Sequence, residues 1–347
     1  MPHLLRPRDL ADGEGNGSQN ERSSLGENRI GKTLISLSIS AVITLLSVSV
    51  SAAQGFRFVS WADTKSGTAA LSAMSNQAKA LNPALTIYPG DLCDSGPSTS
   101  CLTTWKNALN GGSNNGMFDI TFAGRGNHDG DNASSSWVSF FNFAGVATRI
   151  GVTNYVEQSK NLTYSFDYQN AHFAALDAPG GDASTLSASQ LTWLDSDLTT
   201  AESRGLTHAF IFFHGPEYYT DDHPDTLPQA LITVLSTHSI VSATFHGHEH
   251  IMAYVHIDSS RISGVTRPWE EFVTGAGGTD RHSCNGSRSD WCDDTRNGFA
   301  LAEVAGNTFT VSMYAQGNTT PIKTWTFAKD GGSGDSPSSA PQDLKTR

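Results

Sequence analysis

The stretches Gly126-Asn127-His128-Asp129 and Gly247-His248-Glu249-His250 each follow a short apolar run of the chain. Runs of this length and composition predict buried β-strands. Five such strands are expected, over residues 56–61, 85–88, 120–123, 209–213 and 241–245. The three strands outside the quoted motifs are each followed by a polar residue of the type that binds metals, namely Asp63, Asp91 and His214.

Helical patterns lie between these runs. The residues Leu71, Met74, Ala78 and Leu81 have helical spacing. Further on, Ser187 and Gln190 have the spacing of a capping box ahead of a leucine-rich segment. Strands that alternate with helices predict a layered α/β core.

The polar residues at the five strand ends predict a metal site. In an α/β sheet, ligands gather at the carboxyl ends of the strands, so these side chains are expected to meet at one edge. Carboxylate, carboxamide and imidazole donors without a thiolate suit zinc, manganese or iron. Taken singly, each of these residues is also common in turns or in a protein core. Only their occurrence together, one after each strand, favours a metal site.

This ordered set resembles the calcineurin-like metallophosphoesterase superfamily, which includes the purple acid phosphatases. The resemblance rests on Asp63, Gly90-Asp91, the two quoted motifs and His214, in that order. It is supported by Tyr164-Ser165-Phe166-Asp167-Tyr168 with His172-Phe173 and Leu176-Asp177, and by Gln190-Leu191-Thr192-Trp193-Leu194. The resemblance implies an α/β (α+β) fold, a four-layer αββα sandwich of two mixed sheets flanked by helices. It also implies two metal ions, Zn, Mn or Fe, at the strand ends.

The resemblance also implies a role for each residue that matches the motifs. Asp91 would bridge the two metals, while Asp63 and His250 would bind one ion and Asn127, His214 and His248 the other. His128 would be the general acid for the leaving oxygen, with Asp129 as its orienting partner. The alternative for His128 is a structural histidine beside the site.

The first motif departs from the family pattern. Most of the superfamily has Asp-x-His here, whereas this chain has Asp63-Thr64-Lys65. Purple acid phosphatases instead supply a tyrosine three residues after the bridging aspartate, where this chain has Asp94. Either Asp94 completes this metal site, or the Lys65 ammonium lies where a cation would bind or contacts substrate phosphate. A third possibility is that Lys65 is an ordinary solvated lysine.

Several neighbouring residues are candidates for substrate contact. Arg125 could bind phosphate, and Tyr218 could stack on the organic part of a substrate. His223 and His282 lie in polar segments that could line a cleft. Strand alternation could point His246 away from the metals, into a packing role.

Composition excludes several other classes of protein. The chain has 347 residues, of which 37% are hydrophobic and 16% charged, which excludes a disordered or fibrous protein. Acidic residues outnumber basic ones 34 to 22, giving a net charge of −12 and a pI near 5.3. Binding to nucleic-acid phosphates needs a basic surface, so no nucleic-acid binding is expected.

The chain ends differ from its body. Residues 1–53 have a long polar segment, a basic flank, an apolar stretch over 34–50 and Ser51-Ala52-Ala53, a pattern that predicts a signal peptide cleaved after Ala53. The alternative is an uncleaved N-terminal anchor. The metallophosphoesterase domain is expected over 54–329, and the Gly/Ser/Pro-rich residues 330–347 as a disordered tail.

The four cysteines suit an exported protein. The expected disulfides are Cys93–Cys101 and Cys284–Cys292, although four cysteines allow three pairings and a four-cysteine zinc site is the rival. Glycosylation sequons begin at Asn132, Asn161, Asn285 and Asn318.

The function expected from these features is that of a secreted phosphoesterase. A metal-bridging water or hydroxide would attack a small phosphate mono- or diester, with His128 as general acid, in a monomeric chain with no membrane span after cleavage. The alternative is a catalytically degenerate family member that binds phosphate or glycan, because Lys65 replaces the usual histidine. A serine hydrolase is disfavoured, since no Gly-x-Ser-x-Gly motif follows a strand.

Overall fold

The computed structural model describes residues 55–130, 134–219 and 229–329. The expected leader over 1–53, the tail over 330–347, His223 and the sequon at Asn132 lie outside these residues. All described residues belong to one compact unit. Within the described part, no helix is long and apolar enough to cross a membrane.

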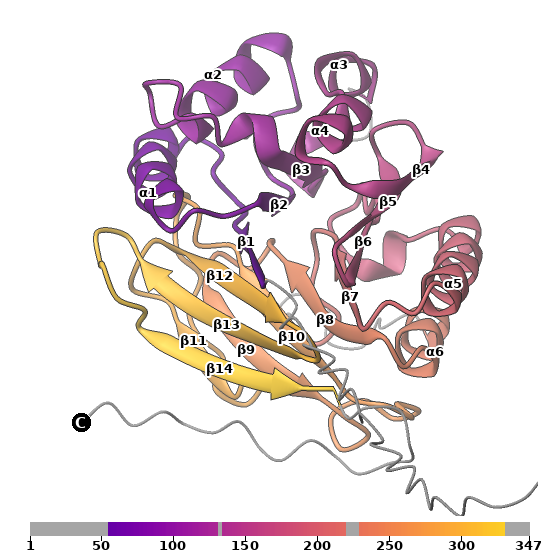
Figure 1. Cartoon of the computed structure of the whole chain (residues 1–347). Helices are drawn as coiled ribbons and strands as arrows, with labels where there is room; N and C mark the ends of the chain where they lie inside the picture. The colour runs from indigo at the N-terminus through magenta and orange to yellow at the C-terminus, as the bar shows by residue number, and fades with distance from the viewer. Residues whose placement is uncertain (1–54, 131–133, 220–228, 330–347) are drawn as a thin grey trace, which may run out of the picture. The chain divides into compact units, whose positions relative to one another are not determined.

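The first sheet has six strands in the order β14-β13-β12-β1-β2-β3 (Figure 1). Its parallel half consists of β1 (Phe56–Ser60), β2 (Leu85–Pro89) and β3 (Thr121–Gly124). The antiparallel half consists of β12 (Gly298–Ala305), β13 (Thr308–Ala315) and β14 (Lys323–Ala328). The sheet is therefore mixed, with the strands that precede Asp63, Asp91 and Asn127 side by side in its parallel half.

The second sheet has eight strands in the order β11-β9-β10-β8-β7-β6-β5-β4. Its central strands run parallel and are β6 (Ala171–Ala175), β7 (His208–Phe212), β8 (Val241–His246) and β10 (Trp269–Thr274). Antiparallel strands flank them, namely β4 (Thr153–Ser159), β5 (Thr163–Tyr168), β9 (Met252–Ile257) and β11 (Trp291–Asp293). His214 and His248 follow the neighbouring strands β7 and β8.

The two sheets pack face to face through aromatic side chains. The ring of Phe58 on β1 lies 5.2 Å from Phe173, 5.0 Å from Phe210 and 5.4 Å from Phe245, which belong to β6, β7 and β8. All four side chains are fully buried, so this contact forms the centre of the larger core. Fully burying one such side chain contributes about 1.5–3 kcal/mol.

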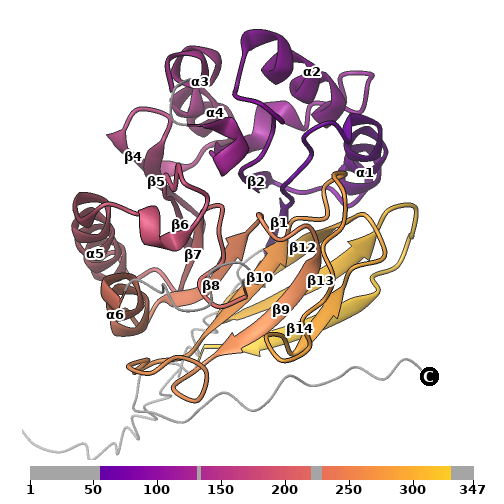
Figure 2. The same ribbon diagram turned by 180° about the vertical axis from the view of Figure 1, so that it is seen from behind.

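Helices cover the outer faces of the sheets (Figures 1 and 2). The helices α1 (Thr68–Ala80) and α2 (Thr99–Leu109) pack beside the first sheet, and their buried residues join the larger core. The helices α5 (Ala188–Ser203) and α6 (Gln229–Thr237) pack on the second sheet and form a separate core with it. The short helices α3 (Ser134–Phe140) and α4 (Phe143–Ile150) lie between β3 and β4 in the sequence. The predicted sandwich of two mixed sheets flanked by helices is confirmed.

The predicted helices are present, with one difference in capping. Leu71, Met74 and Ala78 are buried on α1, as their spacing predicts. At the start of α5, the Ser187 hydroxyl accepts a hydrogen bond from the Gln190 N–H, which is half of the expected capping box. The Gln190 side chain does not complete the box, because it bonds instead to the backbone of Asp177 and to the Thr163 hydroxyl.

The cysteines lie in the expected pairs. Cys93–Cys101 and Cys284–Cys292 have Cα–Cα distances of 6.0 and 5.9 Å and form disulfides in the structure. The side chain of Asn161, the first residue of a predicted glycosylation sequon, is buried and donates hydrogen bonds to the carbonyls of Val138 and Phe141. A glycan needs an accessible side-chain nitrogen, so Asn161 is a structural residue of the folded protein.

Candidate metal centre

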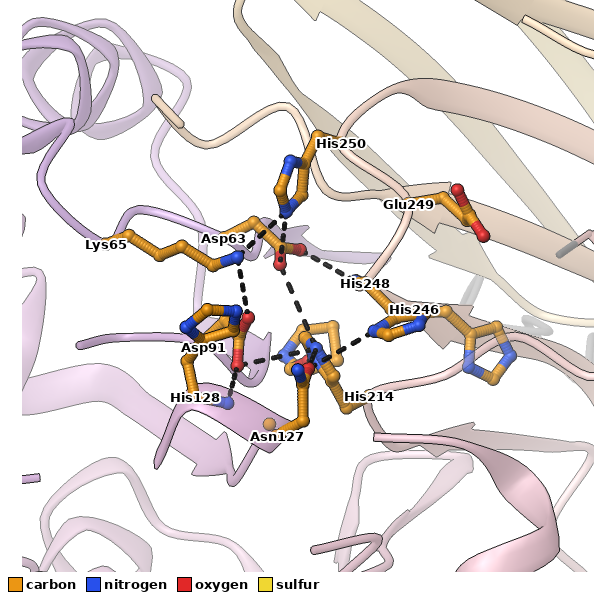
Figure 3. Close-up of polar contacts among 12 residues, drawn as sticks. Asp63, Lys65, Asp91, Asn127, His128, His214, His246, His248, Glu249 and His250 are labelled. Atoms are coloured by element: carbon orange, nitrogen blue, oxygen red, sulfur yellow. Dashed lines mark hydrogen bonds and ion pairs between the residues drawn. The ribbon is translucent and has the colours of Figure 1, made fainter. Parts of the chain in front are cut away.

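The polar residues predicted at the strand ends converge in the structure (Figure 3). Asp63, Asp91 and the 3-10 turn Asn127–Asp129 follow β1, β2 and β3 of the first sheet. His214 follows β7, and both His248 and His250 follow β8. The two sheets thus contribute ligands from opposite sides, the first mainly oxygen donors and the second imidazoles.

Tight backbone packing explains the glycines in the motifs. A Cβ atom on Gly126 would lie 2.1 Å from Asp91 Oδ1, and one on Gly247 would lie 2.3 Å from Asp63 Oδ2. No side chain can be tolerated at such distances without movement of the carboxylates. Both glycines therefore allow the loops to approach the site residues closely.

One group of donors is well arranged to hold a cation. His214 Nε2 lies 3.0 Å from Asn127 Oδ1 and 3.4 Å from Asp91 Oδ1, and His248 Nδ1 lies 3.2 Å from Asn127 Oδ1. The Nδ1–H of His214 donates to the Pro89 carbonyl at 2.8 Å, so Nε2 is the ring nitrogen that faces the other donors. These donors fit a first-row divalent ion.

On the other side of Asp91, the side chain of Lys65 lies among the residues predicted to bind the other metal ion. His250 Nε2 lies 3.7 Å from Asp63 Oδ1, as expected of two ligands to one ion. However, Lys65 Nζ lies 3.2 Å from Asp91 Oδ2 and 3.0 Å from His250 Nε2, between the same two residues. The residues on this side therefore hold a positive charge already, that of the Lys65 ammonium.

Electrostatics show that the site favours positive charge. Burial raises the pKa of Asp63 well above its ordinary value. Burial acts in the same direction on Asp91, but the charge and hydrogen bond of His214, together with the charges of Lys65 and His128, outweigh it and lower the pKa of Asp91. Burial alone would lower the pKa of His214, whereas the carboxylates of Asp91 and Asp63 raise it to about 9. Asp63 Oδ1 is buried and accepts no hydrogen bond from the described residues, whereas the buried Asp91 Oδ2 has the Lys65 ammonium at 3.2 Å, so positive charge compensates Asp91 on this side.

The two histidines after β8 have the protonation state that ligands need. Burial and the charge of His214 lower the pKa of His248 to about 4. Burial and the charge of Lys65 lower the pKa of His250 to about 3. Both rings are therefore neutral near pH 7 and offer a lone pair.

The environment of His128 differs from the prediction. Its backbone N–H donates to Asp91 Oδ1 at 2.9 Å, and its ring Nδ1 lies 2.7 Å from the Asp94 carbonyl oxygen. The carboxylate of Asp129 is buried and accepts three backbone N–H groups, those of Leu92, Cys93 and Gly126. Asp129 therefore connects the loops after β2 and β3, and the group that orients the His128 ring is the Asp94 carbonyl.

Two predicted substrate contacts are engaged elsewhere. Arg125 is 5% exposed and makes a bidentate ion pair with Asp177, at 2.9 and 2.7 Å. The Tyr218 ring lies within 5.5 and 5.2 Å of the guanidinium carbons of Arg261 and Arg288. Arg125 lies next to the Gly126–Asp129 motif and Tyr218 lies four residues after His214. Their side-chain partners, however, come from distant segments of the chain.

The side chain of Asp94 is exposed and lines a pocket of about 380 Å³ together with Lys65. Other lining residues are small and polar, among them Ser66, Thr68 and Ser95. Nearby, the ring of His282 stacks on His250 with centroids 4.0 Å apart. A pocket therefore opens beside the segments that carry Lys65 and Asp94.

A second buried cluster, formed by Glu217, His246 and Glu271, contacts the loop that follows His214. His246 lies away from Asp91, as alternation predicts, with its Nδ1 on the Phe213 carbonyl and its Nε2 2.8 Å from Glu217 Oε2 (Figure 3). Glu271 accepts the backbone N–H groups of Tyr218 and Tyr219 at 2.8 Å each. The cluster thus holds the loop that follows His214. Glu217, His246 and Glu271 come from three separate segments, so no motif in the sequence could have indicated this cluster.

Burial determines how the second cluster is protonated. It raises the pKa of Glu217 to about 7 and that of Glu271 to about 8, and it lowers the pKa of His246 to about 4. Two neighbouring carboxyl groups without a cation cannot both be ionised easily, so they hold a proton near neutral pH.

Comparisons with known proteins agree with this geometry. Residues 56–252 match the family model of the calcineurin-like phosphoesterases. No match was found among curated proteins. These matched residues contain every strand-end residue that converges at the site, from Asp63 to His250.

Solved structures share the fold at low sequence identity. A purple acid phosphatase from yellow lupin (Lupinus luteus) is 13% identical, with a TM-score of 0.59 over 80% of this chain and 54% of its own. This chain therefore spans about half the length of the lupin protein. A dimetal phosphatase from Danio rerio is 16% identical, with a TM-score of 0.51 over 79% of this chain and 99% of its own.

A third structure, GAP50, is described as the anchor in the inner membrane complex of Plasmodium. It is 15% identical, with a TM-score of 0.54 over 80% of this chain and 90% of its own. At these identities the three likenesses show the fold alone. Together with the family model, which covers more than half of the residues, they establish that this chain belongs to the calcineurin-like phosphoesterase family.

Proposed function

We propose that this protein is an exported, metal-dependent phosphoesterase that hydrolyses small phosphate mono- or diesters. The observation that carries the proposal is the convergence of Asp91, Asn127, His214 and His248, with the His214 tautomer set by the Pro89 carbonyl. Family membership supports the reaction class, and the two disulfides support an oxidising compartment.

A cation held by these four residues would supply Lewis acidity toward a phosphoryl oxygen. In the overall reaction a water oxygen bonds to phosphorus, the ester P–O bond breaks, and the leaving oxygen takes up a proton. His128 would supply that proton from Nε2, and the contact of its Nδ1 with the Asp94 carbonyl supports this role. The pocket beside Lys65 can receive the leaving group or the remainder of the substrate.

The test is turnover of p-nitrophenyl phosphate and its bis-ester by chelator-treated protein resupplied with Mn, Zn or Fe. We expect metal-dependent turnover, and the preferred ester distinguishes a monoesterase from a diesterase. His128→Ala should lower kcat by about 100-fold or more while metal content stays unchanged. His256→Ala is the matched control, because this histidine pairs with Glu270 on the neighbouring strand β10 and is not one of the converging residues.

The second candidate is a phosphate-binding protein without turnover. It is favoured by the position of the Lys65 ammonium, which lies where the family pattern leads one to expect a metal ligand. One fold can serve unrelated roles, so the fold cannot choose between the two candidates. Metal binding without hydrolysis of either ester under any of the three metals would establish the second candidate and reject the first.

A further inference from the structure

The side chain of Lys65 reaches into the site and is not a solvated surface group. Only 7% of it is exposed, and Figure 3 shows it directed at Asp91 and His250. Its ammonium has an anionic oxygen at 3.2 Å and an imidazole nitrogen at 3.0 Å. A lysine ammonium has three donors and no acceptor, so at this distance it donates a hydrogen bond to His250 Nε2.

The loop that carries Lys65 fixes the ammonium in this place. The backbone N–H of Lys65 donates to the Asp91 carbonyl at 3.3 Å, and the Thr64 hydroxyl is hydrogen-bonded to the Tyr88 hydroxyl. Lys65 itself has a φ of 46°, a left-handed conformation that costs a non-glycine residue free energy and persists only where the surroundings impose it. The loop is therefore built to direct this side chain inward.

An ammonium and a divalent ion cannot share this position. An ion bound by Asp91 and His250 needs the same Oδ2 and Nε2 atoms at about 2.0–2.2 Å, the distances of Zn–O and Zn–N bonds. Both atoms already face Lys65 Nζ. Two positive charges at such a separation also repel each other strongly in a buried site.

We propose that the centre holds one metal ion, and that the Lys65 ammonium replaces the second. The inference rests on the proposed function for its substrate, a phosphate ester. The ammonium would donate hydrogen bonds to a non-bridging oxygen of the phosphoryl group and balance its charge, while no proton leaves the lysine. His250 then serves as a hydrogen-bond partner of the ammonium. The metal ligands in this proposal are Asp91, Asn127, His214 and His248.

Metal stoichiometry tests this inference without reference to activity. Mn²⁺ is titrated into the chelator-treated full chain, and bound metal is counted by elemental analysis and by calorimetry. The wild type should bind one ion per chain. Lys65→His, which restores the Asp-x-His pattern, should bind two. The electron paramagnetic resonance spectrum should change from that of an isolated Mn²⁺ ion to that of an exchange-coupled pair.

Lys160→His is the matched control, because Lys160 is an exposed lysine in the turn between β4 and β5. It should bind one ion, as the wild type does. Two ions in the wild type, or one ion in a folded Lys65→His variant, would overturn the inference whatever the turnover. One ion in the wild type with no hydrolysis of either ester would leave the inference standing and reject the proposed function. A wild type that binds no Mn²⁺ would reject both.

Discussion

Four residues of the candidate site have backbone conformations that are unusual for their type. The φ angles are 59° for Asp63, 46° for Lys65, 58° for Asp91 and 68° for His248. A non-glycine residue in this region costs about 1–3 kcal/mol, and such residues cluster at active sites. Here the left-handed turns direct side chains from the strand ends back toward one another. The site is thus preorganised by its backbone before any ligand binds.

The first prediction concerns the close approach of Gly126 to Asp91. Gly126→Ala would place a Cβ 2.1 Å from Asp91 Oδ1 and 2.7 Å from His214 Cε1, so both side chains must move. We expect a loss of about 1–3 kcal/mol in the free energy of unfolding, as for other overpacked sites. Mn²⁺ affinity should fall by about tenfold or more, as when the surroundings of a ligand are disturbed. Urea unfolding and calorimetry measure the two effects.

The control is Gly286→Ala, since a Cβ at Gly286 meets no atom within 4 Å and its φ is not left-handed. It should change neither stability nor Mn²⁺ affinity. If Gly126→Ala behaved like this control, the close packing of the loops would not be what positions Asp91.

The sequence predicted which residues would converge, but not what each contacts. The order of Asp63, Asp91, Asn127, His214 and His248 is informative because each follows a strand, and parallel strands end at one edge. Contacts such as that of Arg125 with Asp177 depend on a residue 52 positions away. Asp129 likewise follows His128 in sequence and yet faces the loop after β2. Adjacency in sequence was therefore a poor guide to side-chain partners.

At the scale of elements, an ion-paired histidine joins α5 to the second sheet. His172 on β6 is buried, with Nδ1 2.8 Å from Asp167 on β5 and Nε2 2.9 Å from Asp197 on α5. Burial would lower the pKa of His172, but the hydrogen bonds to Asp167 and Asp197 outweigh it and raise the pKa. The same contact contributes to a lowered pKa of Asp167, although its burial acts in the opposite direction. The predicted α5 thus depends on a polar contact that helical periodicity does not reveal.

This contact predicts how stability depends on pH. A raised pKa of His172 in the folded state means that its contribution is fully present below the unfolded value, about 6.5, and is lost as pH rises through the folded value. The free energy of unfolding should therefore fall as pH rises above about 6.5. In His172→Gln this fall should be smaller, and at about pH 6 the variant should be less stable by about 1–3 kcal/mol.

Urea unfolding of the metal-loaded protein at several pH values measures the difference between wild type and variant. His208→Gln is the comparison variant, because burial lowers the pKa of His208 to about 4 and this histidine is neutral across the same range. It should leave the slope of stability against pH unchanged above about pH 7.5, where His208 is neutral in the unfolded state as well as in the folded state. Parallel curves for wild type and His172→Gln would show that His172 is not charged in the folded state.

At the scale of the whole described unit, the site lies where two sheets meet. The apolar strands predicted from the sequence bury Phe58, Phe210 and Phe245 in the contact between the sheets. Their pattern indicates burial but cannot state which sheet each strand joins, because strand pairing is decided by contacts distant in the chain. The family resemblance supplied that part of the prediction, and the topology agrees with it.

The position of the site predicts that metal binding stabilises the whole unit. Asp91 and Asn127 come from the first sheet, whereas His214 and His248 come from the second, so one ion would connect both. A ligand that binds only the folded state stabilises it by about 2.7 kcal/mol at a free concentration of about 100 times Kd. Urea unfolding with Mn²⁺ at that level, and again after chelation, should show this difference.

Two variants show which residues bind the ion that stabilises the fold. His214→Ala removes a ligand of the second sheet and should abolish the Mn²⁺-dependent gain. Lys65→Met removes the ammonium but none of the four ligands, so the gain from the first ion should remain while turnover falls. A gain that survived His214→Ala would place the ion elsewhere. The buried cluster of Glu217, His246 and Glu271 would then be the place to examine, because its ligand atoms lie within 4.8 Å of one another, as do those of Asp63, Asp91 and His214. Loss of the gain in Glu217→Gln but not in His214→Ala would assign the stabilising ion to that cluster, and the first sheet would then carry no metal ligand that affects stability.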